Sequence, residues 1–267
     1  MNRVIALLVL LLAWSGVLRG IPAPVTLRVL TYNIHHGEGT DGRFDLVRIA
    51  DIVKRAQPDL VALQEVDQGT ERASAVNQLA ELERLTGMHG TFGRAMEYLG
   101  GDYGVAVLSR WPIVSARNRA LPGAPDREPR TALTVQVRAG DDGPWLRFTS
   151  THFDQGRDEQ NRLAQAASLN DLEIDADQPA ILAGDFNSRP DTEVMKTLDA
   201  RWMNALNAFQ ADPSPASDGR PRRGDYVLFR PVDRWRVIET SVIDERIASD
   251  HRPVLGVLEW TGERTDR

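Results

Sequence analysis

The chain has 267 residues, of which 42% are hydrophobic and 26% charged, and it contains no cysteine. A chain of this length and composition can bury a sizeable core, as one large domain or two small ones. The lack of cysteine excludes disulfides, thiolate metal sites and cysteine nucleophiles. The formal net charge of −6 argues against a protein that grips long DNA nonspecifically, because such proteins carry a basic face.

The N-terminal segment differs from the rest of the chain. Arg3 is followed by an unbroken apolar run over residues 4–14. This arrangement is typical of an export signal and is short for a membrane-spanning helix. We therefore predict a signal peptide or N-terminal hydrophobic segment over residues 1–24 and an exported protein, periplasmic or secreted. An uncleaved membrane anchor is the alternative. Loss of Arg3 and Arg19 with the first 20 residues leaves 30 basic and 38 acidic residues, a net charge of −8.

Strand and helix patterns alternate along the remaining chain. Strands are predicted where apolar and polar residues alternate or where short apolar runs end at turns, and helices where apolar residues recur at helical spacing. The predicted strands cover residues 25–32, 60–66, 105–108, 113–115, 131–137, 146–151, 181–184, 226–229, 236–242 and 254–260. The predicted helices cover residues 46–53, 76–85, 159–172 and 192–198. The mixture predicts one layered α/β domain over residues 25–260, with sheets packed on one another, helices outside, and a disordered tail over residues 261–267.

Polar side chains stand at the ends of several predicted strands. The residues that the predicted strands reach in this way are Asn33, Glu65, His152, Asp185 and Asn187. A carboxylate at such a place is costly unless a partner, water or a metal satisfies it. Strand ends are also where a layered α/β fold gathers distant residues into one crevice. The repetition therefore favours a shared polar site.

Two further polar groups flank strands. Asp225 opens the strand at 226–229, and Asp250 and His251 precede the last strand. The whole set consists of carboxylates, amides and imidazoles, and hard oxygen ligands suit Mg²⁺ or Mn²⁺. Zinc held by His152, His251 and an Asp is an alternative, but no closely spaced histidine pair on a helix supports it.

Each of these residues also has an ordinary structural explanation. Asp185 can cap the helix that follows, Asn33 can belong to a turn, and a single histidine such as His152 is commonly a satisfied core or surface residue. Glu65 is harder to explain in this way, because it directly follows an apolar strand. The case for a site rests on the set and not on any one member.

Seven segments of the chain carry a resemblance to a known family. In chain order they are "YNIHHG", "LVALQEVD", "VAVLSRWP", "STHFD", "LAGDFNSRP", "DYVL" and "SDHRPV", within residues 28–258. The chain resembles the endonuclease/exonuclease/phosphatase superfamily, also called DNase I-like. The resemblance implies a four-layer α/β sandwich, in which two packed mixed β-sheets are flanked by helices, and divalent-metal cleavage of phosphate esters.

The resemblance also implies a role for each motif residue. It places Asn33 and Glu65 at the metal, with Asp250 completing or supporting that site. It implies that Asp185 orients or deprotonates the attacking water and that Asn187 holds a phosphate oxygen.

The histidine motifs complete this implied site. The resemblance implies that His251 contacts the phosphate, positioned by Asp225, and that His152 donates to the developing negative charge. Phosphoryl transfer puts charge on the non-bridging oxygens, so a metal and fixed donors stabilise its transition state. The nucleophile must be a water, because the chain has no cysteine and no serine in an elbow motif.

Two positions depart from the family pattern. Nuclease branches often have an acid where this chain has His35, which weakens a second metal contact and a DNA-nuclease assignment. His35 and His36 form the one tight histidine pair, and adjacent side chains on an extended segment are expected to point to opposite sides. Gly224 stands where an apolar residue commonly precedes the Asp, which leaves the burial of Asp225 open.

Several residues outside these motifs are candidates for substrate binding. A loop at residues 212–224 carries Arg222 and Arg223, and arginine forks fit phosphate well; a solvated basic loop is the alternative. Tyr103 and Arg130 lie near motif segments and are expected to line the cleft. Tyr103 resembles the position of a family tyrosine that touches phosphate.

The sequence thus predicts an exported, Mg²⁺-dependent phosphoesterase, more specifically a phosphodiesterase, with Mn²⁺ able to replace Mg²⁺. A small or lipid-linked phosphate ester is favoured as substrate over long DNA. The alternatives are a secreted metal-dependent nuclease of the same fold and a non-catalytic binding protein. We expect a monomer without an obligate protein partner, and membrane contact only if the N-terminal segment is uncleaved.

Overall fold

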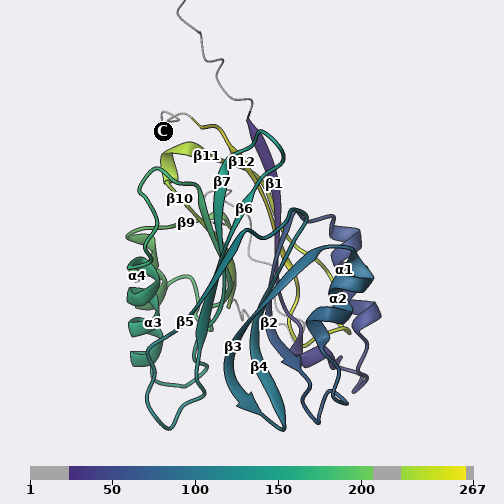
Figure 1. The fold of residues 1–267 in the computed structure, drawn as a ribbon. Helices are drawn as coiled ribbons and strands as arrows, with labels where there is room; N and C mark the ends of the chain where they lie inside the picture. Colours follow the sequence, from purple (N-terminus) through teal and green to yellow (C-terminus); the bar gives the residue numbers. More distant parts are fainter. Residues whose placement is uncertain (1–23, 207–223, 263–267) are drawn as a thin grey trace, which may run out of the picture.

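The computed structural model describes residues 24–206 and 224–262 (Figure 1). Two six-stranded sheets lie face to face. The first sheet has the strand order β11-β12-β1-β2-β4-β3 and the second β5-β6-β7-β8-β10-β9. The strands of the first sheet are β1 (Val25–Asn33), β2 (Leu60–Gln68), β3 (His89–Tyr98), β4 (Gly101–Ser109), β11 (Trp235–Val242) and β12 (Val254–Trp260). Those of the second are β5 (Ser115–Ala120), β6 (Thr131–Arg138), β7 (Trp145–His152), β8 (Ala180–Asp185), β9 (Met203–Asn204) and β10 (Asp225–Arg230).

Helices cover the outer face of each sheet. On the first sheet these are α1 (Leu46–Ala56) and α2 (Gln78–Thr86), and on the second α3 (Gln160–Asn170) and α4 (Glu193–Asp199) (Figure 1). Two short 3₁₀ turns, η1 (His35–Gly37) and η2 (Val232–Arg234), complete the described elements. Parallel pairs, β1 with β2 and β7 with β8, occur beside antiparallel pairs. The predicted four-layer sandwich of two mixed sheets is confirmed.

Three apolar clusters fill the spaces between these layers. The middle cluster lies between the sheets and includes Leu27 and Val29 of β1. The two outer clusters lie beneath the helices, and one of them contains Leu30 and Tyr32 of the same strand. The alternation follows from the strand period, since successive side chains point to opposite faces.

Toward one end of the sheets the middle layer becomes polar. The hydroxyl of Thr31 donates to Oε1 of Gln64 over 3.3 Å, and Nε2 of Gln64 donates to the hydroxyl of Ser150 over 3.4 Å. All three side chains are fully buried. Because a buried polar group is costly without a partner, these bonds fix β1, β2 and β7 relative to one another close to where β1 and β7 end.

The structure differs from the predicted elements in a few places. Strands β3 and β9 were not predicted, and the strand expected at residues 113–115 instead begins at Ser115. Strand β3 is an edge strand that pairs only with β4, and it has few apolar residues to reveal it. Helix α4 begins later than expected, after Thr192, whose hydroxyl accepts from the amide of Met195.

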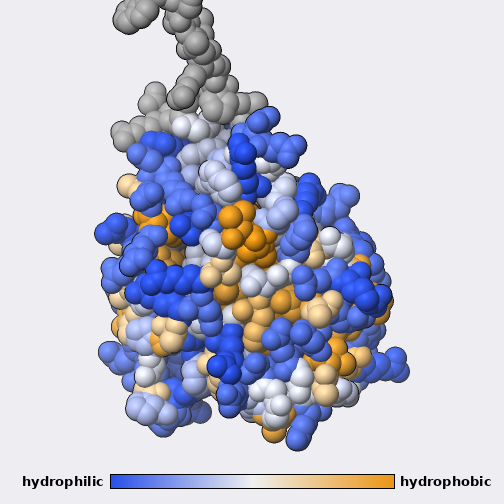
Figure 2. Space-filling view, in the orientation of Figure 1, coloured by the Kyte–Doolittle hydropathy of each residue, from blue (hydrophilic) through white to orange (hydrophobic). Residues whose placement is uncertain are grey.

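The chain ends bear on the predicted domain bounds. Thr261, the first residue of the predicted tail, donates its amide to the carbonyl of Arg234 over 3.0 Å. Residues 263–267 and most of the predicted N-terminal segment lie outside the described residues, as do Arg222 and Arg223. Across residues 24–206 and 224–262, no helix has the length and apolar character needed to cross a membrane. Figure 2 shows one face, where hydrophobic side chains gather near the middle between hydrophilic flanks.

Candidate active site

The second sheet places three predicted site residues side by side. His152 ends β7, Asp185 ends β8 and Asp225 begins β10. In the strand register Asp185 is the partner of both His152 and Asp225. The first sheet contributes Asn33 at the end of β1 and Glu65 on β2. Parallel neighbours bring their carboxyl ends to the same edge, which is why residues far apart in the sequence meet here.

Asp185 lies at the centre of the group and is only 1% exposed. Its Oδ2 atom is 3.4 Å from Nδ2 of Asn33, 3.6 Å from Nε2 of His152 and 3.7 Å from Nε2 of His251. Its Oδ1 atom accepts the amide of Asn187 over 2.8 Å. The carboxylate is therefore held by a backbone bond on one oxygen and surrounded by nitrogen atoms on the other.

The surroundings of Asp185 change its acidity. Burial and the neighbouring Asp225 carboxylate raise the pKa of Asp185 from 3.8 to about 6. The helix-cap alternative for Asp185 is wrong, because Thr192 caps α4 and the bond to Asn187 instead closes a local turn. A carboxylate that titrates near neutral pH is suited to accept a proton from water.

His251 is oriented by Asp225. Its Nδ1 atom is 2.9 Å from Oδ2 of Asp225, and its amide donates to the hydroxyl of Ser249 over 3.1 Å. Burial alone would lower the pKa of His251, but Asp225 and Asp185 outweigh burial and raise that pKa well above its ordinary value. The ring is thus an imidazolium near neutral pH, donating from Nδ1 to Asp225 and presenting Nε2–H toward Asp185.

Gly224 explains how Asp225 reaches this position. A Cβ atom on Gly224 would lie 2.4 Å from Oδ1 of Asp185, closer than real contacts allow. The carbonyl of Gly224 also accepts the amide of Phe186. The departure from the apolar residue of the family pattern therefore makes room for the Asp185 carboxylate, while the Asp225 side chain is 12% exposed.

His152 has a different partner, Arg130. Nη1 of Arg130 lies 3.0 Å from Nδ1 of His152 and 2.7 Å from a Glu128 carboxylate oxygen. A guanidinium has only donors, so Nδ1 of His152 must accept and Nε2 must carry the proton. Burial and the Arg130 charge hold the pKa of His152 well below its ordinary value. His152 is therefore a neutral donor that presents Nε2–H to Asp185.

A bulge in β2 sets the position of Glu65. The pairing of β2 with β4 shifts between Gln64 and Val66, and Glu65 has a φ of 58°. Such a residue leaves the regular ladder, and its side chain is re-aimed. Oε1 of Glu65 accepts from Nδ2 of Asn33 over 2.9 Å. Burial alone would raise the pKa of Glu65, but the hydrogen bond from Asn33 helps to outweigh burial and lower it.

The expectation for His35 and His36 is wrong. The two residues form a 3₁₀ turn, not an extended segment, with φ values of 46° and 44°. Their rings lie close together, with centroids 4.3 Å apart. One potential ligand atom from each of His35, His36 and Glu65 lies within 4.8 Å of the others. Sequence reasoning missed this group because an extended backbone was assumed; the signal available was the unusual tight pair two residues after Asn33.

Other predicted residues lie at the margin of this group. Asp250 is exposed, and neither cluster of possible metal ligands among the described residues includes it. Its neighbour Ser249, which was not predicted, donates to the carbonyl of Asn33 over 2.7 Å and thereby ties the loop before β12 to β1. Asn187 has a φ of 47° and donates from Nδ2 to the carbonyl of Phe153 over 3.0 Å, which leaves one amide hydrogen for another acceptor.

Tyr103 lies on β4 and is 5% exposed. Burial and the nearby carboxylates of Glu65 and Glu128 raise the pKa of Tyr103 well above its ordinary value. Its hydroxyl is therefore a neutral donor near neutral pH. The guanidinium of Arg72 lies 5.4 Å from the Tyr103 ring and 4.7 Å from the Tyr98 ring.

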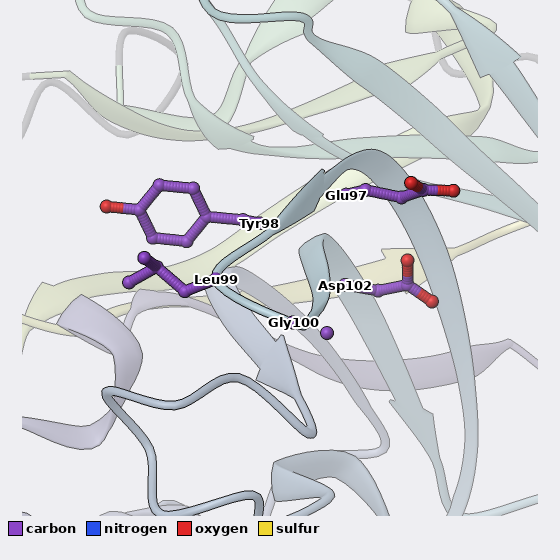
Figure 3. Close-up of a pocket in the computed structure, with 6 residues that line it drawn as sticks. Glu97, Tyr98, Leu99, Gly100 and Asp102 are labelled. Carbon is purple, nitrogen blue, oxygen red and sulfur yellow. The ribbon is translucent and has the colours of Figure 1, made fainter.

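A hollow of about 470 Å³ lies at the turn between β3 and β4, lined by Glu97, Tyr98, Leu99, Gly100, Gly101 and Asp102. Figure 3 shows Tyr98 and Leu99 projecting to one side of the turn and Glu97 and Asp102 to the other. None of the predicted catalytic or metal residues lines it. The hollow is thus separate from the chemistry, although the Tyr98 ring lies 6.2 Å from the Tyr103 ring.

Comparisons with known proteins agree with this geometry. Residues 30–251 match the model of the Endonuclease/Exonuclease/phosphatase family. The chain belongs to this family. Members of the endonuclease/exonuclease/phosphatase family are hydrolases that act on phosphate esters. Among the related sequences is the uncharacterized protein YbhP of Escherichia coli (strain K12), which is 32% identical over 174 residues, covering 61% of this chain and 67% of the relative.

Solved structures of the family share the fold. The endonuclease/exonuclease/phosphatase of Beutenbergia cavernae superposes with a TM-score of 0.73 and 26% identity, covering 88% of this chain and 72% of that chain. The mannosyl-6-phosphatase of Bacteroides thetaiotaomicron has a TM-score of 0.69 and 20% identity, covering 87% of this chain and 99% of that chain. At that identity the likeness extends to the fold alone.

Within residues 24–206 and 224–262, two groups of three residues have the spacing of metal ligands. Asp185, Asp225 and His251 form one, with ligand atoms within 4.8 Å of one another. An imidazolium has no free lone pair, so His251 acts there as a donor and not as a ligand. The other group contains Glu65, which stands beside the amide of Asn33. The carboxylate of Glu65 is an oxygen donor that fits a divalent cation, the kind of ion on which this family generally depends.

Proposed function

We propose that the protein is a divalent-metal-dependent phosphodiesterase that hydrolyses a small or lipid-linked phosphate ester with an activated water. The observation that carries this proposal is the environment of Asp185, a buried carboxylate whose pKa is about 6. Nε2 of both His152 and His251 lies within 3.7 Å of one of its oxygens. A base and two donors that face one small volume are the parts that hydrolysis of a phosphate ester needs.

Each of these groups has a distinct task in the proposed reaction. Asp185 accepts the proton of the attacking water, for which a pKa near the working pH is favourable. His251, held as an imidazolium by Asp225, donates to a phosphate oxygen. His152, held in its neutral Nε2–H form by Arg130, donates to a second oxygen. Fixed donors stabilise the charge that develops on these oxygens without reorganising.

The metal belongs to the other side of the site. Glu65, with Asn33 at 2.9 Å, would hold it, and Asp250 would support it from the loop before β12. A divalent ion supplies Lewis-acid stabilisation of the phosphate when bound. Mg²⁺ or Mn²⁺ suits these oxygen donors. The side chain of Glu65 is ionised under these conditions, because its pKa lies below its ordinary value.

The charge of the chain supports the substrate class. The net charge of −6 disfavours a long polyanion, whose binding gains from many released counterions. A phosphodiester on a small molecule or lipid head group needs only local donors. Tyr103 and Arg130, both buried near His152 or Glu65, are proposed to face the phosphate side. Export, periplasmic or secreted, remains part of the proposal on the strength of the N-terminal sequence.

Hydrolysis assays test the proposed function. Purified protein is offered bis-p-nitrophenyl phosphate, p-nitrophenyl phosphate, sphingomyelin or phospholipid vesicles, inositol phosphates and plasmid DNA, each with Mg²⁺, with Mn²⁺ and with EDTA. We expect metal-dependent cleavage of the diester that disappears in Asp185→Asn. The matched control is Asp141→Asn, an exposed acid on the turn at the far ends of β6 and β7. Plasmid cleavage as the main activity would favour the nuclease, and inertness toward every ester would favour a binding protein.

A further inference from the structure

The 3₁₀ turn after β1 places two imidazoles beside Glu65. We propose that His35, His36 and Glu65 form a metal site of two imidazoles and one carboxylate, which binds a transition-metal ion such as Zn²⁺ in preference to Mg²⁺. This proposal rests on the proposed function in one respect, since Glu65 is the carboxylate that would hold the catalytic ion. It concerns the identity of that ion and the residues that select it.

His36 is the central observation. It is 7% exposed, and its Nδ1 atom is buried without a hydrogen-bond partner among the described residues. The same atom lies 3.9 Å from Oε2 of Glu65. On the other side of the ring, Nε2 lies 3.3 Å from Oε2 of Glu38. A carboxylate only accepts, so Nε2 carries the proton in the neutral ring and Nδ1 has the free lone pair. A buried nitrogen lone pair beside a carboxylate is suited to bind a metal cation.

His35 is oriented by the same residue. Its Nδ1 atom lies 3.0 Å from the backbone carbonyl oxygen of Glu38. A carbonyl also only accepts, so Nδ1 of His35 is the protonated nitrogen and Nε2 has the lone pair. Glu38 thus accepts a hydrogen bond from each imidazole, from His36 at its side chain and from His35 at its backbone carbonyl. Histidines that bind metals commonly donate their second nitrogen to a carboxylate or carbonyl in this way.

The turn is held firmly against β2. Nε2 of Gln78 donates to the carbonyl of His36, and Oε1 of Gln78 accepts the amide of Asp67 over 2.9 Å. Gly37 has a φ of 83°, and a Cβ atom there would approach Leu46 and Gln78 to 3.1 and 3.3 Å. The two imidazoles are therefore fixed relative to the strand that carries Glu65.

The donor set determines which ion is favoured. Mg²⁺ prefers oxygen ligands in octahedral geometry and keeps several waters. Imidazole suits zinc and neighbouring transition metals, whose affinity for a given nitrogen site generally exceeds that of Mn²⁺. Two imidazoles in addition to one carboxylate shift the preference away from Mg²⁺. This makes His35, at the position where nuclease branches often have an acid, a residue that selects the ion.

Metal titrations of the chelator-treated full chain test the proposal without reference to activity. Binding of Zn²⁺, Mn²⁺ and Mg²⁺ is measured by calorimetry or equilibrium dialysis. We expect Zn²⁺ to bind at least 100-fold more tightly than Mg²⁺. His36→Gln should weaken Zn²⁺ binding by about 10-fold to 100-fold or more while changing Mg²⁺ binding little. His89→Gln, an exposed histidine at the start of β3, is the matched control and should bind as the parent does.

Glu38→Gln provides a second variant that touches neither ligand nitrogen in the proposed site. It removes the carboxylate that orients His36, so about 10-fold weaker Zn²⁺ binding is expected, with an unchanged far-ultraviolet spectrum. Equal affinity for Zn²⁺ and Mg²⁺, or Zn²⁺ binding unaffected by both variants, overturns the proposal.

The two proposals fail in distinguishable ways. Tight Zn²⁺ binding that depends on His36, in a protein inert toward every phosphate ester, would remove the proposed function and keep this site. Diester hydrolysis with metal affinities that ignore His36 and Glu38 would do the reverse.

Discussion

The guanidinium of Arg130 donates to Nδ1 of His152 over 3.0 Å and thereby fixes the tautomer of a buried imidazole. Arg130 is itself 4% exposed and paired with Glu128 at 2.7 Å. Because a guanidinium has donors and no acceptor, Nδ1 of His152 must accept and the proton of the neutral ring stays on Nε2. A cation behind the ring also opposes its protonation, so His152 and His251 stand on either side of Asp185 in different charge states.

Replacing Arg130 by methionine tests this relationship. In Arg130→Met the pKa of His152 should rise, because the opposing charge is gone, and Nδ1 loses its donor. We expect kcat to fall by about 10-fold to 100-fold, the range typical for partners that orient a catalytic ring. Nitrogen chemical shifts of a ¹⁵N-histidine sample report the tautomer and the pKa. Arg117→Met, at an exposed position of β5, is the control, and an unaltered His152 signal in Arg130→Met would contradict the assignment.

The raised pKa of Asp185 predicts a trade between activity and stability. The pKa of Asp185 is higher in the folded protein than in the unfolded chain, so protonation of Asp185 favours the folded state. This contribution to the free energy of unfolding is full below pH 3.8 and is lost as the pH rises through about 6. Asp185→Asn should thus lose about 10²–10⁴-fold in kcat. Its free energy of unfolding at pH 8 should be larger than that of the parent by roughly 3 kcal/mol, which is the equivalent of a pKa shift from 3.8 to about 6.

Urea unfolding in EDTA measures this gain. The stability difference between Asp185→Asn and the parent should shrink steadily as the pH falls from 8 to 4.5. Asp141→Asn shows whether any acid-to-amide change has this effect. A variant that is less stable than the parent at pH 8 would mean that the buried carboxylate is well compensated by its neighbours.

The pH dependence of the proposed reaction follows from the same two groups. kcat/KM should rise as the pH increases through about 6, as Asp185 becomes a base. It should fall again at alkaline pH, where His251 loses the proton that Asp225 holds on it. The raised pKa of His251 also stabilises the folded protein. This contribution is fully present at a pH below the ordinary histidine pKa and is lost as the pH rises through the pKa of His251 in the folded protein.

Asp225→Asn tests which groups determine the two limbs of this pH–rate profile. The carboxamide still accepts from Nδ1 of His251, but the negative charge is absent, so the pKa of His251 falls and the alkaline limb moves to lower pH. The loss of the Asp225 charge also lowers the pKa of Asp185, so the acid limb moves in the same direction. pH–rate profiles with bis-p-nitrophenyl phosphate measure both shifts, and an alkaline limb that stays in place would assign it to another group.

Sequence patterns predicted much of this fold and site, for a physical reason. A largely apolar segment that ends abruptly in an acid or amide marks a buried strand with a polar tip, and Asn33, Glu65 and Asp185 end such segments. Central strands with apolar side chains on both faces are also easy to recognise. Edge strand β3 has neither an apolar run with a polar tip nor apolar side chains on both faces, and it was not predicted.

The remaining features depend on backbone states and partners that residue types do not reveal. His35 and His36 meet because two successive non-glycine residues adopt positive φ, which sequence patterns rarely indicate. The contact of Arg130 with His152 depends on the register of β6 and β7. Asp250 was expected at the metal by resemblance, and its exposed position on the loop before β12 could not be read from its motif.

Gly224 offers a test in which one methyl group is added beside the proposed base. Its Cβ in Gly224→Ala would lie 2.4 Å from Oδ1 of Asp185, so the carboxylate or the start of β10 must move. A displacement of about 1 Å can cost 10²-fold in rate, so we expect kcat to fall by about that factor while the protein stays folded. Gly123→Ala, where nothing lies within 4 Å, is the matched control for both melting temperature and rate. Unchanged diester hydrolysis in Gly224→Ala would contradict this prediction. It would mean that the reaction proceeds with a displaced Asp185 carboxylate, which is not expected of a base whose position is set by the amide of Asn187.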